Sequence, residues 1–405
     1  MENGTKQKTA YPLIAVLSVL LGYLIYRFAE VELTDVLSDY SGHLYVYLPK
    51  FSLATLKEGW ETVPYFLWHG TVLLLNRVLM IPLEQAAIFT SALYAIAAYL
   101  VVTFLLNRYE QRMNGERHGE RNALLAFGLM VVQGIYLNWV GVYGNFLGIY
   151  SPNPYHNPPQ MCVTVFSLIC LALVTDIIEK MGNADYAGCF FPVEKGLKKY
   201  YLLLTCVLFL SVLAKPTFAE MFIPAVGLYM LIKRPGKSVA NIWHLFLCAV
   251  PALLYIALQY IDYFLLGGRF NSSGEVILTK AGEVWSLYSD NLLLSVLLGM
   301  AFPITILLMD VRYFVTQPMG ILGVLCYTVG LLEACFLGES GERFFHGNFI
   351  WPMMSGMLML WVVSLLRLLA LEKQAETKGQ KACIFFAWFL FGLHVLMGIL
   401  MLYHM

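Results

Sequence analysis

The sequence predicts an all-α polytopic membrane protein with about eleven transmembrane helices. Of its 405 residues, 59% are hydrophobic and 13% are charged, whereas an ordinary soluble domain carries about 25% charged residues. The mean hydropathy is +0.69, and most charged residues gather between long apolar runs. These observations predict that the whole chain, residues 1–405, forms a single membrane-embedded domain.

Eleven apolar runs are long enough for a spanning helix, which needs about 20 mainly apolar residues. A further apolar segment, 64–83, is interrupted by His69, Asn76, Arg77 and two prolines, and we interpret it as a re-entrant or interfacial helix. The outer loop 29–84 is therefore expected to carry interfacial helices. The predicted spans lie near residues 11–28, 85–106, 122–142, 161–179, 199–214, 218–232, 241–260, 290–311, 318–337, 350–368 and 383–403.

The basic residues are distributed unequally between the two sides of this threading. When 64–83 is not counted as a span, 18 of the 26 Lys and Arg residues fall on the side that carries residues 108–121. Lys and Arg collect in cytoplasmic loops. The N-terminus is therefore predicted to be cytoplasmic, and the C-terminus and residues 151–160 to be external. The first apolar run is too long for a signal peptide, so we expect it to stay as an anchor.

Charge, cysteine usage and motifs exclude several classes of protein. The 26 basic and 26 acidic residues cancel, so no overall field attracts nucleic acid, and we expect no nucleic-acid partner. The eight cysteines show no CxxC spacing, which favours neither a disulfide framework nor a metal site. The sequence has no HExxH, Walker A, GxSxG or DxD motif, so metalloprotease, P-loop and serine-hydrolase functions have no support. We predict no cofactor and no metal.

The unusual polar residues lie in the predicted outer loops, the first of which contains VELTDVLSDYSGHLYVYL, residues 31–48. A carboxylate at a partly desolvated surface can act as a general base, and a histidine one turn later can share its proton. A stripe that simply faces water explains the same pattern. Read as one interfacial helix, the segment places four polar side chains on one face: Glu32, Asp35, Asp39 and His43.

The outer loop SPNPYHNPPQ, residues 151–160, contains four prolines, so it is rigid and not helical. Rigidity suits the wall of a binding site. Asn153, His156 and Asn157 are neutral donors and acceptors of the kind that read sugar hydroxyls. A stiff connector without a binding role accounts for the prolines equally well.

Lys215 precedes Pro216 inside the apolar stretch VLFLSVLAKPTFAEMFIP. An ionisable group in such a stretch is costly, which makes it a functional candidate. Near a lipid phosphate it supplies a compact positive charge. Two simpler explanations are that Lys215 reaches the membrane surface with its long stem, or that it pairs with Glu220.

The late outer loop GESGERFFHGNF, residues 338–349, contains the candidates Glu342, Arg343 and His346. An Arg fork binds phosphate oxygens in a bidentate manner. We therefore expect Arg343 and Lys215 to converge near the outer membrane surface and to bind a lipid phosphate together. A plain ion pair of Arg343 with Glu339 or Glu342 is the competing explanation.

This arrangement resembles the GT-C superfamily of integral-membrane glycosyltransferases. The resemblance covers the architecture of most of the chain: a first span, a long outer loop with an early aspartate, interfacial helices, many further spans, a Pro-rich outer loop and a late basic outer loop. Four segments are similar to parts of bacterial surface-polysaccharide membrane proteins of this type: DYSGH at 39–43, VPYFLWH at 63–69, SPNPYHNPPQ at 151–160 and ERFFHGNFIW at 342–351.

The resemblance implies an inverting glycosyltransferase of the bacterial plasma membrane with an external active site. In that superfamily the donor is typically a sugar on a polyprenyl phosphate, and an acidic residue of the first outer loop deprotonates the acceptor hydroxyl. By resemblance Asp39 takes this role, with Asp35 as its substitute. The implied partners are a polyprenyl-phosphate-linked sugar, a glycan or lipid-linked acceptor, and membrane lipid. Some members use paired acids with a divalent metal, and this sequence lacks such a pair.

Two other functions stay open at this point. A lipid-linked oligosaccharide polymerase or ligase has closely related chemistry and differs in what is transferred. A transporter or flippase of lipid-linked sugars predicts charged groups at mid-membrane depth along a two-sided path, whereas the polar candidates here lie on one predicted side.

Overall fold

The computed structural model describes residues 2–51, 63, 65–115, 118–136, 150–235, 239–262 and 275–404, apart from the side chains of residues 2–9, 114, 342 and 404. In this part of the chain the fold is all-α except for one two-stranded sheet. Its main elements are α1 (Glu2–Glu32), α2 (Asp39–Ser41), η1 (Gly42–Tyr47), η2 (Leu48–Lys50), α4 (Leu67–Leu79), α5 (Leu83–Asn114), α6 (Gly119–Val131), α7 (Pro158–Gly182), α8 (Lys198–Ala214), α9 (Thr217–Lys233), α10 (Val239–Tyr260), β1 (Val276–Leu278), η6 (Trp285–Leu287), α11 (Leu292–Met309), α12 (Val311–Thr316), α13 (Pro318–Phe336), β2 (Leu337–Glu339), η7 (Gly341–His346), α14 (Ile350–Gln374) and α15 (Lys378–His404).

Within the described segments, eight helices are long and apolar enough to cross a membrane: α1, α5, α7, α10, α11, α13, α14 and α15. This confirms the prediction of an all-α membrane-embedded protein. Four other apolar helices are shorter, with 13 residues each in α4 and α6 and 17 residues each in α8 and α9.

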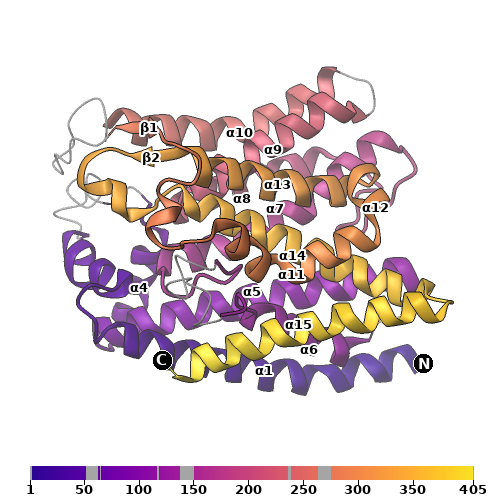
Figure 1. Ribbon diagram of the computed structural model, residues 1–405, viewed down its shortest axis with the longest axis horizontal. Coiled ribbons are helices and arrows are strands. Elements are labelled where there is room, and N and C mark those ends of the chain that lie inside the picture. Colours follow the sequence, from indigo (N-terminus) through magenta and orange to yellow (C-terminus); the bar gives the residue numbers. More distant parts are fainter. Residues whose placement is uncertain are drawn as a thin grey trace.

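The long helices lie side by side along the longest axis of the molecule (Figure 1). α4, β1 and β2 lie at one end, here called the strand end, and α12 lies at the opposite end, here called the α12 end. The N-terminus is at the α12 end and the C-terminus is at the strand end. At the strand end, β1 pairs antiparallel with β2 and Val276 lies opposite Glu339, which joins the segments that precede α11 and α14.

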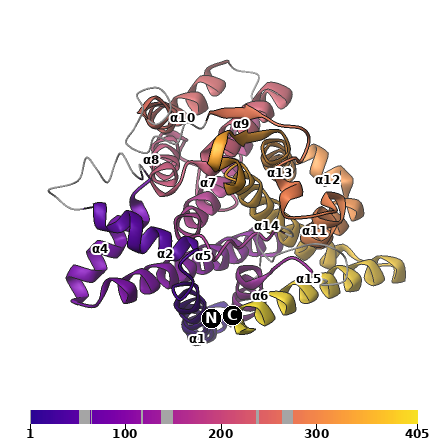
Figure 2. The same cartoon turned by 60° about the vertical axis from the view of Figure 1, so that its left-hand side comes forward.

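α14 is the central helix of the bundle, and Figure 2 shows it beside α7 in the middle of the molecule. Its side chains are buried almost without interruption from Ile350 to Ala370. α13 packs directly against it, because a Cβ on Gly330 would lie only 2.6 Å from the Met353 Cα. Small residues permit such close approach between helices in a membrane. The apolar middle of α14 therefore separates the two ends of the bundle.

The predicted span 122–142 is helical only as far as Val131, where α6 ends. Residues 132–136 are not helical, and two of their amides bond to other helices: Gln133 donates to the His394 carbonyl at 3.1 Å and Ile135 to the Leu298 carbonyl at 3.0 Å. Gly398 makes room for this change, since a Cβ there would lie 1.5 Å from the Val131 carbonyl oxygen. The helix ends because its backbone groups find partners on α15 and α11. Residues 137–142 lie outside the described residues.

The prediction of one amphipathic helix over residues 31–48 is wrong. α1 ends at Glu32, turns follow, and α2 has only three residues. The Leu37 amide donates to the Asp35 carboxylate at 2.9 Å, and the Ser41 amide donates to the Ser38 hydroxyl at 3.1 Å. Short polar side chains of this kind compete with helix hydrogen bonds.

The segment 64–83 contains a helix that is too short to cross the membrane. α4 has 13 residues, a length of about 20 Å, whereas the hydrocarbon core is about 30 Å thick. It ends at Met80, whose φ of 52° is left-handed, shortly before Pro82. Leu74, Val78 and Met80 are exposed, as expected of an apolar face that lies against lipid.

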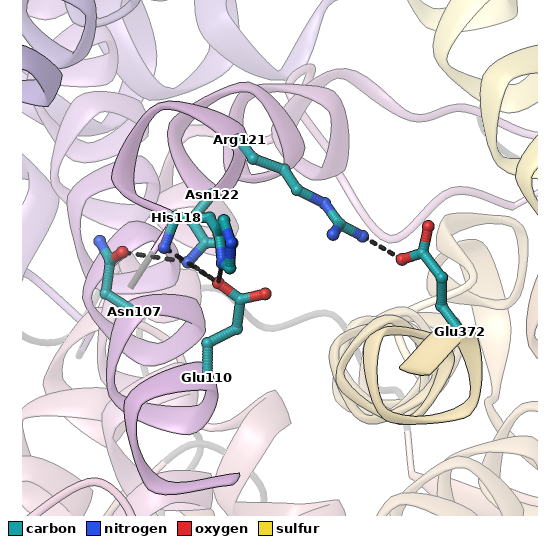
Figure 3. Close-up of polar contacts among 6 residues, drawn as sticks. All are labelled: Asn107, Glu110, His118, Arg121, Asn122 and Glu372. Atoms are coloured by element: carbon teal, nitrogen blue, oxygen red, sulfur yellow. Dashed lines mark hydrogen bonds and ion pairs between the residues drawn. The ribbon is translucent and has the colours of Figure 1, made fainter. Parts of the chain in front are cut away.

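The described residues of the basic segment 108–121 belong to the end of α5 and the start of α6, at the α12 end. Glu110 is completely buried and accepts hydrogen bonds from the Asn122 side chain at 2.9 Å and from the His118 amide at 3.3 Å. Arg121 pairs with Glu372 on α14 (Figure 3). The buried carboxylate thus fixes α5 against α6.

Candidate functional site

Three polar side chains from distant parts of the chain meet at the strand end. Asp39 begins α2, Asn157 precedes α7, and Lys215 lies in the turn between α8 and α9. The Asn157 side-chain nitrogen donates to Asp39 Oδ2 at 2.7 Å. Lys215 Nζ donates to Asn157 Oδ1 at 3.2 Å. One amide therefore bridges a carboxylate and an ammonium group.

The orientation of the Asn157 amide follows from its position as the N-cap of α7. Its Oδ1 also accepts a hydrogen bond from the Gln160 amide at 3.0 Å, as cap residues commonly do. Two donors thus face the oxygen, so the side-chain nitrogen is the atom that points toward Asp39. Pro158 and Pro159 stiffen the first turn behind it. The bridge is built on a rigid helix end.

Lys215 is buried, with 6% of its surface exposed. Its ammonium group lies 4.2 Å from the centre of the Trp351 ring, a cation–π contact that helps to replace lost water. Burial lowers the pKa of Lys215 to about 8, against the opposing effect of the Asp39 and Glu220 carboxylates. The side chain therefore carries a positive charge at neutral pH in a largely dry site.

Asp39 presents its carboxylate at the surface of this cluster. The residue is exposed, and its helix is capped by Ser38. Below it, Tyr40 is fully buried and its hydroxyl donates to Met161 Sδ at 3.5 Å, which fixes α2 on α7. Asp39 is thus held in place by Asn157 and remains open to a solute.

His156 adds a neutral ring to the cluster. Its imidazole lies 5.1 Å from the Trp351 ring. Burial lowers the pKa of His156 to about 4, with the Asp39 charge raising it and the Lys215 charge lowering it. The imidazole is therefore uncharged at neutral pH.

His43 has a different partner from the one expected. Its Nδ1 hydrogen-bonds to His69 Nε2 at 3.1 Å, and its ring packs near Trp68 and Tyr47. Burial lowers the pKa of both histidines, that of His69 to about 3. His43 of η1 thus belongs to a neutral histidine pair with His69 of α4, and no hydrogen bond joins it to Asp39.

Asp35 lies outside the cluster. It is exposed in the turn after α1 and accepts its hydrogen bond from the nearby Leu37 amide. These two aspartates, both in the segment that follows α1, therefore differ in surroundings, because only Asp39 meets the Asn157 bridge.

Asn153 is a structural residue although it belongs to the same Pro-rich loop. It is 2% exposed, and its side-chain nitrogen donates to the carbonyls of Leu129 at 2.8 Å and Val132 at 3.1 Å. Both carbonyls lie at the C-terminal end of α6, where helix carbonyls lack internal partners. Asn153 therefore closes α6, and its amide is not available to a substrate.

We expect Asn153→Ala to lower the free energy of unfolding by about 1–3 kcal/mol, because the buried Leu129 carbonyl loses its donor. Chemical denaturation in detergent measures this change. His346→Ala, at an exposed residue of the strand end, is the control and should leave stability near that of the parent. Unchanged stability of Asn153→Ala together with weaker sugar binding would show instead that Asn153 contacts substrate.

Arg343 and His346 lie on η7 at the same end of the bundle as Lys215. Arg343 Nε donates to Glu339 Oε2 at 3.2 Å, so the ion pair considered as the competing explanation is present. Burial raises the pKa of Tyr47 and Tyr65; the Arg343 charge opposes this rise and the Asp39 charge adds to it. His346 is exposed. The side chain of the other candidate in this loop, Glu342, lies outside the described residues.

Sequence patterns missed four side chains that support the cluster. Gln160 donates to the Ser355 hydroxyl at 2.7 Å and accepts from the Thr217 hydroxyl at 2.8 Å, and Trp351 stacks on Lys215. Gln160 and Trp351 are the last residues of two segments that the sequence analysis singled out, 151–160 and 342–351. Their roles depend on contacts between α7, α9 and α14, which no local pattern encodes.

Within the described part of the chain, no group of three or more His, Cys, Asp or Glu side chains is arranged to hold a metal ion. The arrangement offers instead an accessible carboxylate, a buried cation and a neutral imidazole around one fixed amide. Comparison of the chain with protein-family models, with curated proteins and with solved structures finds no match.

Proposed function

We propose that this chain is an integral-membrane glycosyltransferase similar to the GT-C superfamily, which moves a sugar from a polyprenyl-phosphate donor to an acceptor hydroxyl. The observation that carries the proposal is the Asn157 bridge between Asp39 and Lys215. It fixes an exposed carboxylate and a buried cation together at one end of a membrane-embedded bundle. A base for the acceptor and a cation for the departing phosphate are the groups that this transfer needs.

In the proposed reaction, the Asp39 carboxylate takes the proton of the acceptor hydroxyl while that oxygen attacks the anomeric carbon. The new carbon–oxygen bond forms on the face opposite the phosphate, so the configuration inverts. The bond between the anomeric carbon and the phosphate oxygen breaks, and polyprenyl phosphate leaves with the electron pair. Lys215 stabilises the charge that develops on the phosphate, with Arg343 as a second cation at the same end.

The proposal includes eleven membrane passes: the eight longer helices, α8, α9, and α6 together with the non-helical residues 132–136 that follow it. The termini support an odd number, because they lie at opposite ends of the bundle (Figure 1). The excess of Lys and Arg on the side of residues 108–121 favours a cytoplasmic α12 end and an external strand end. By resemblance, the membrane is the bacterial plasma membrane.

This orientation predicts opposite labelling of two exposed positions in intact cells. Leu37, which is 92% exposed, lies at the strand end, and Asp185 is exposed just after α7 ends. We expect a membrane-impermeant thiol reagent to label Leu37→Cys in intact cells and Asp185→Cys only after permeabilisation. Labelling of the parent chain, which has eight cysteines of its own, gives the background to be subtracted. Labelling of both positions from one side contradicts the threading.

The alternatives differ in specific ways. A two-sided transport path needs polar groups through the bundle, but residues 357–363 of α14, MLMLWVV, are apolar and buried. This observation favours chemistry at one end over transport. A polymerase or ligase would use the same base and cation, and it differs only in transferring an oligosaccharide.

A reconstituted assay with a panel of polyprenyl-phosphate sugars, read by mass spectrometry, tests the proposal. We expect the parent to consume at least one donor and to release polyprenyl phosphate in step with a glycosylated acceptor. Transfer of a whole oligosaccharide would instead identify the polymerase or ligase. Intact donors after prolonged incubation with every acceptor would overturn the proposal.

A further inference from the structure

A cavity of about 410 Å³ opens at the α12 end, away from the Asp39 cluster. It is surrounded by the C-terminal parts of α5, α7 and α14, by α12 and the start of α13, and by the segment that follows α7. Along α14, Trp351 of the cluster and Arg367 of the cavity are separated by about 24 Å of helix. The cavity is therefore a separate site, and sugar transfer at the strand end does not use it.

The charged lining of this cavity has more positive than negative groups. Three arginines, Arg112, Arg312 and Arg367, face two carboxylates, Glu179 and Asp310. Arg367 is already engaged, because its Nε donates to Asp310 Oδ2 at 2.7 Å. Arg112 and Arg312 are exposed and have no ion-pair partner among the residues that the structure describes. Two guanidinium groups thus remain open for an anion.

Tyr313 also lines the cavity. The Tyr313 hydroxyl is buried and has no hydrogen-bond partner within the described segments. The Arg367 guanidinium lies over the Tyr313 ring, 4.9 Å from the ring centre, and this cation–π contact holds the ring in place. A buried hydroxyl without a partner is unfavourable, so an acceptor oxygen on a ligand would satisfy it.

The dimensions and chemistry of the lining define a class of ligand. A volume of this size suits a small polar molecule or a lipid headgroup, and guanidinium forks match phosphate oxygens. Glu179 and Gln317 also line the cavity and can hydrogen-bond to hydroxyl groups. We propose that this cavity binds a phosphate ester that carries hydroxyl groups, with its phosphate at Arg112 and Arg312 and an oxygen at the Tyr313 hydroxyl.

Such an ester can come from a lipid headgroup or from a free metabolite, and two probes distinguish these sources. The purified full-length chain in uncharged detergent is titrated with glycerol 3-phosphate and, separately, with dihexanoylphosphatidylglycerol, and heat of binding is measured. Binding of glycerol 3-phosphate supports a free ester, and binding of the lipid alone supports a headgroup. Absence of binding with both probes overturns the proposal.

Matched variants locate the bound probe. We expect the Arg112→Gln, Arg312→Gln double variant to bind at least about tenfold more weakly, because charged hydrogen bonds are lost, and Tyr313→Phe to bind severalfold more weakly. Arg121→Gln is the control, since Arg121 pairs with Glu372 at the same end (Figure 3) and does not line the cavity. Asp39→Asn should also bind like the parent. Parent affinity in both the double variant and Tyr313→Phe would overturn the assignment.

Discussion

We expect Asp39→Asn to lower turnover by about 10²- to 10⁴-fold, the contribution expected of a general base, and to leave donor affinity near that of the parent. In the parent, the Asn157 side-chain nitrogen donates to Asp39 Oδ2 at 2.7 Å. The asparagine keeps an oxygen that can accept this hydrogen bond, so the shape of the site is retained. The lost function is proton acceptance from the acceptor hydroxyl. Single-turnover rates and donor binding, measured separately, resolve the two effects.

Asp35→Asn is the matched control for this variant. Asp35 lies in the same loop and is also exposed, but its partner is the Leu37 amide. We expect turnover near the parent value. A folded Asp39→Asn enzyme that transfers sugar at the parent rate would remove Asp39 from catalysis, and a large loss in Asp35→Asn alone would move the role to Asp35.

We expect Lys215→Met to lower turnover by about 10²- to 10³-fold, the loss typical of removing one group that stabilises developing negative charge. Methionine retains an unbranched stem against the Trp351 ring, and Asn157 Oδ1 keeps its bond from the Gln160 amide. The fold should therefore persist. Lys280→Met, at an exposed lysine after β1, is the control and should keep parent activity. Parent turnover in Lys215→Met would exclude this cation from the reaction.

The lowered pKa of Lys215 also predicts that both turnover and stability depend on pH. Its pKa is about 8 in the folded protein and 10.5 ordinarily, so phosphate stabilisation should fade as the pH rises through about 8. Stability should move in the opposite direction: between these two values the unfolded chain binds more protons, so the free energy of unfolding rises with pH. Lys215→Met should lose both trends. Parallel pH profiles of the parent and this variant would contradict the pKa assignment.

The positions of most helices could be predicted because apolar length is a local property of the sequence. The predicted span 383–403 lies within α15, and the predicted span 161–179 lies within α7. Both helices are longer than the predicted spans, because polar residues that hydropathy does not detect continue them at their ends. α6 is the exception, since its end at Val131 is set by partners on α11 and α15, which lie far away in the chain.

The composition of the site was only partly predictable, for a related reason. Asn153 and Asn157 occur four positions apart in one Pro-rich loop, yet one closes α6 and the other bridges Asp39 to Lys215. The Asp39–Asn157 contact joins residues 118 positions apart, and only packing of the helices brings them together. His43 likewise faces His69, because the expected continuous helix is interrupted after Glu32.

The most direct test of sugar transfer at the Asp39–Asn157–Lys215 site is a mass-spectrometric time course with proteoliposomes that contain polyprenyl-phosphate sugars and hydroxyl acceptors. We predict that the parent releases polyprenyl phosphate and forms glycoside with inverted configuration in equal amounts, and that Asp39→Asn and Lys215→Met show at most about one hundredth of this rate. Equal rates in all three proteins, or movement of intact donor across the bilayer without cleavage, would contradict it.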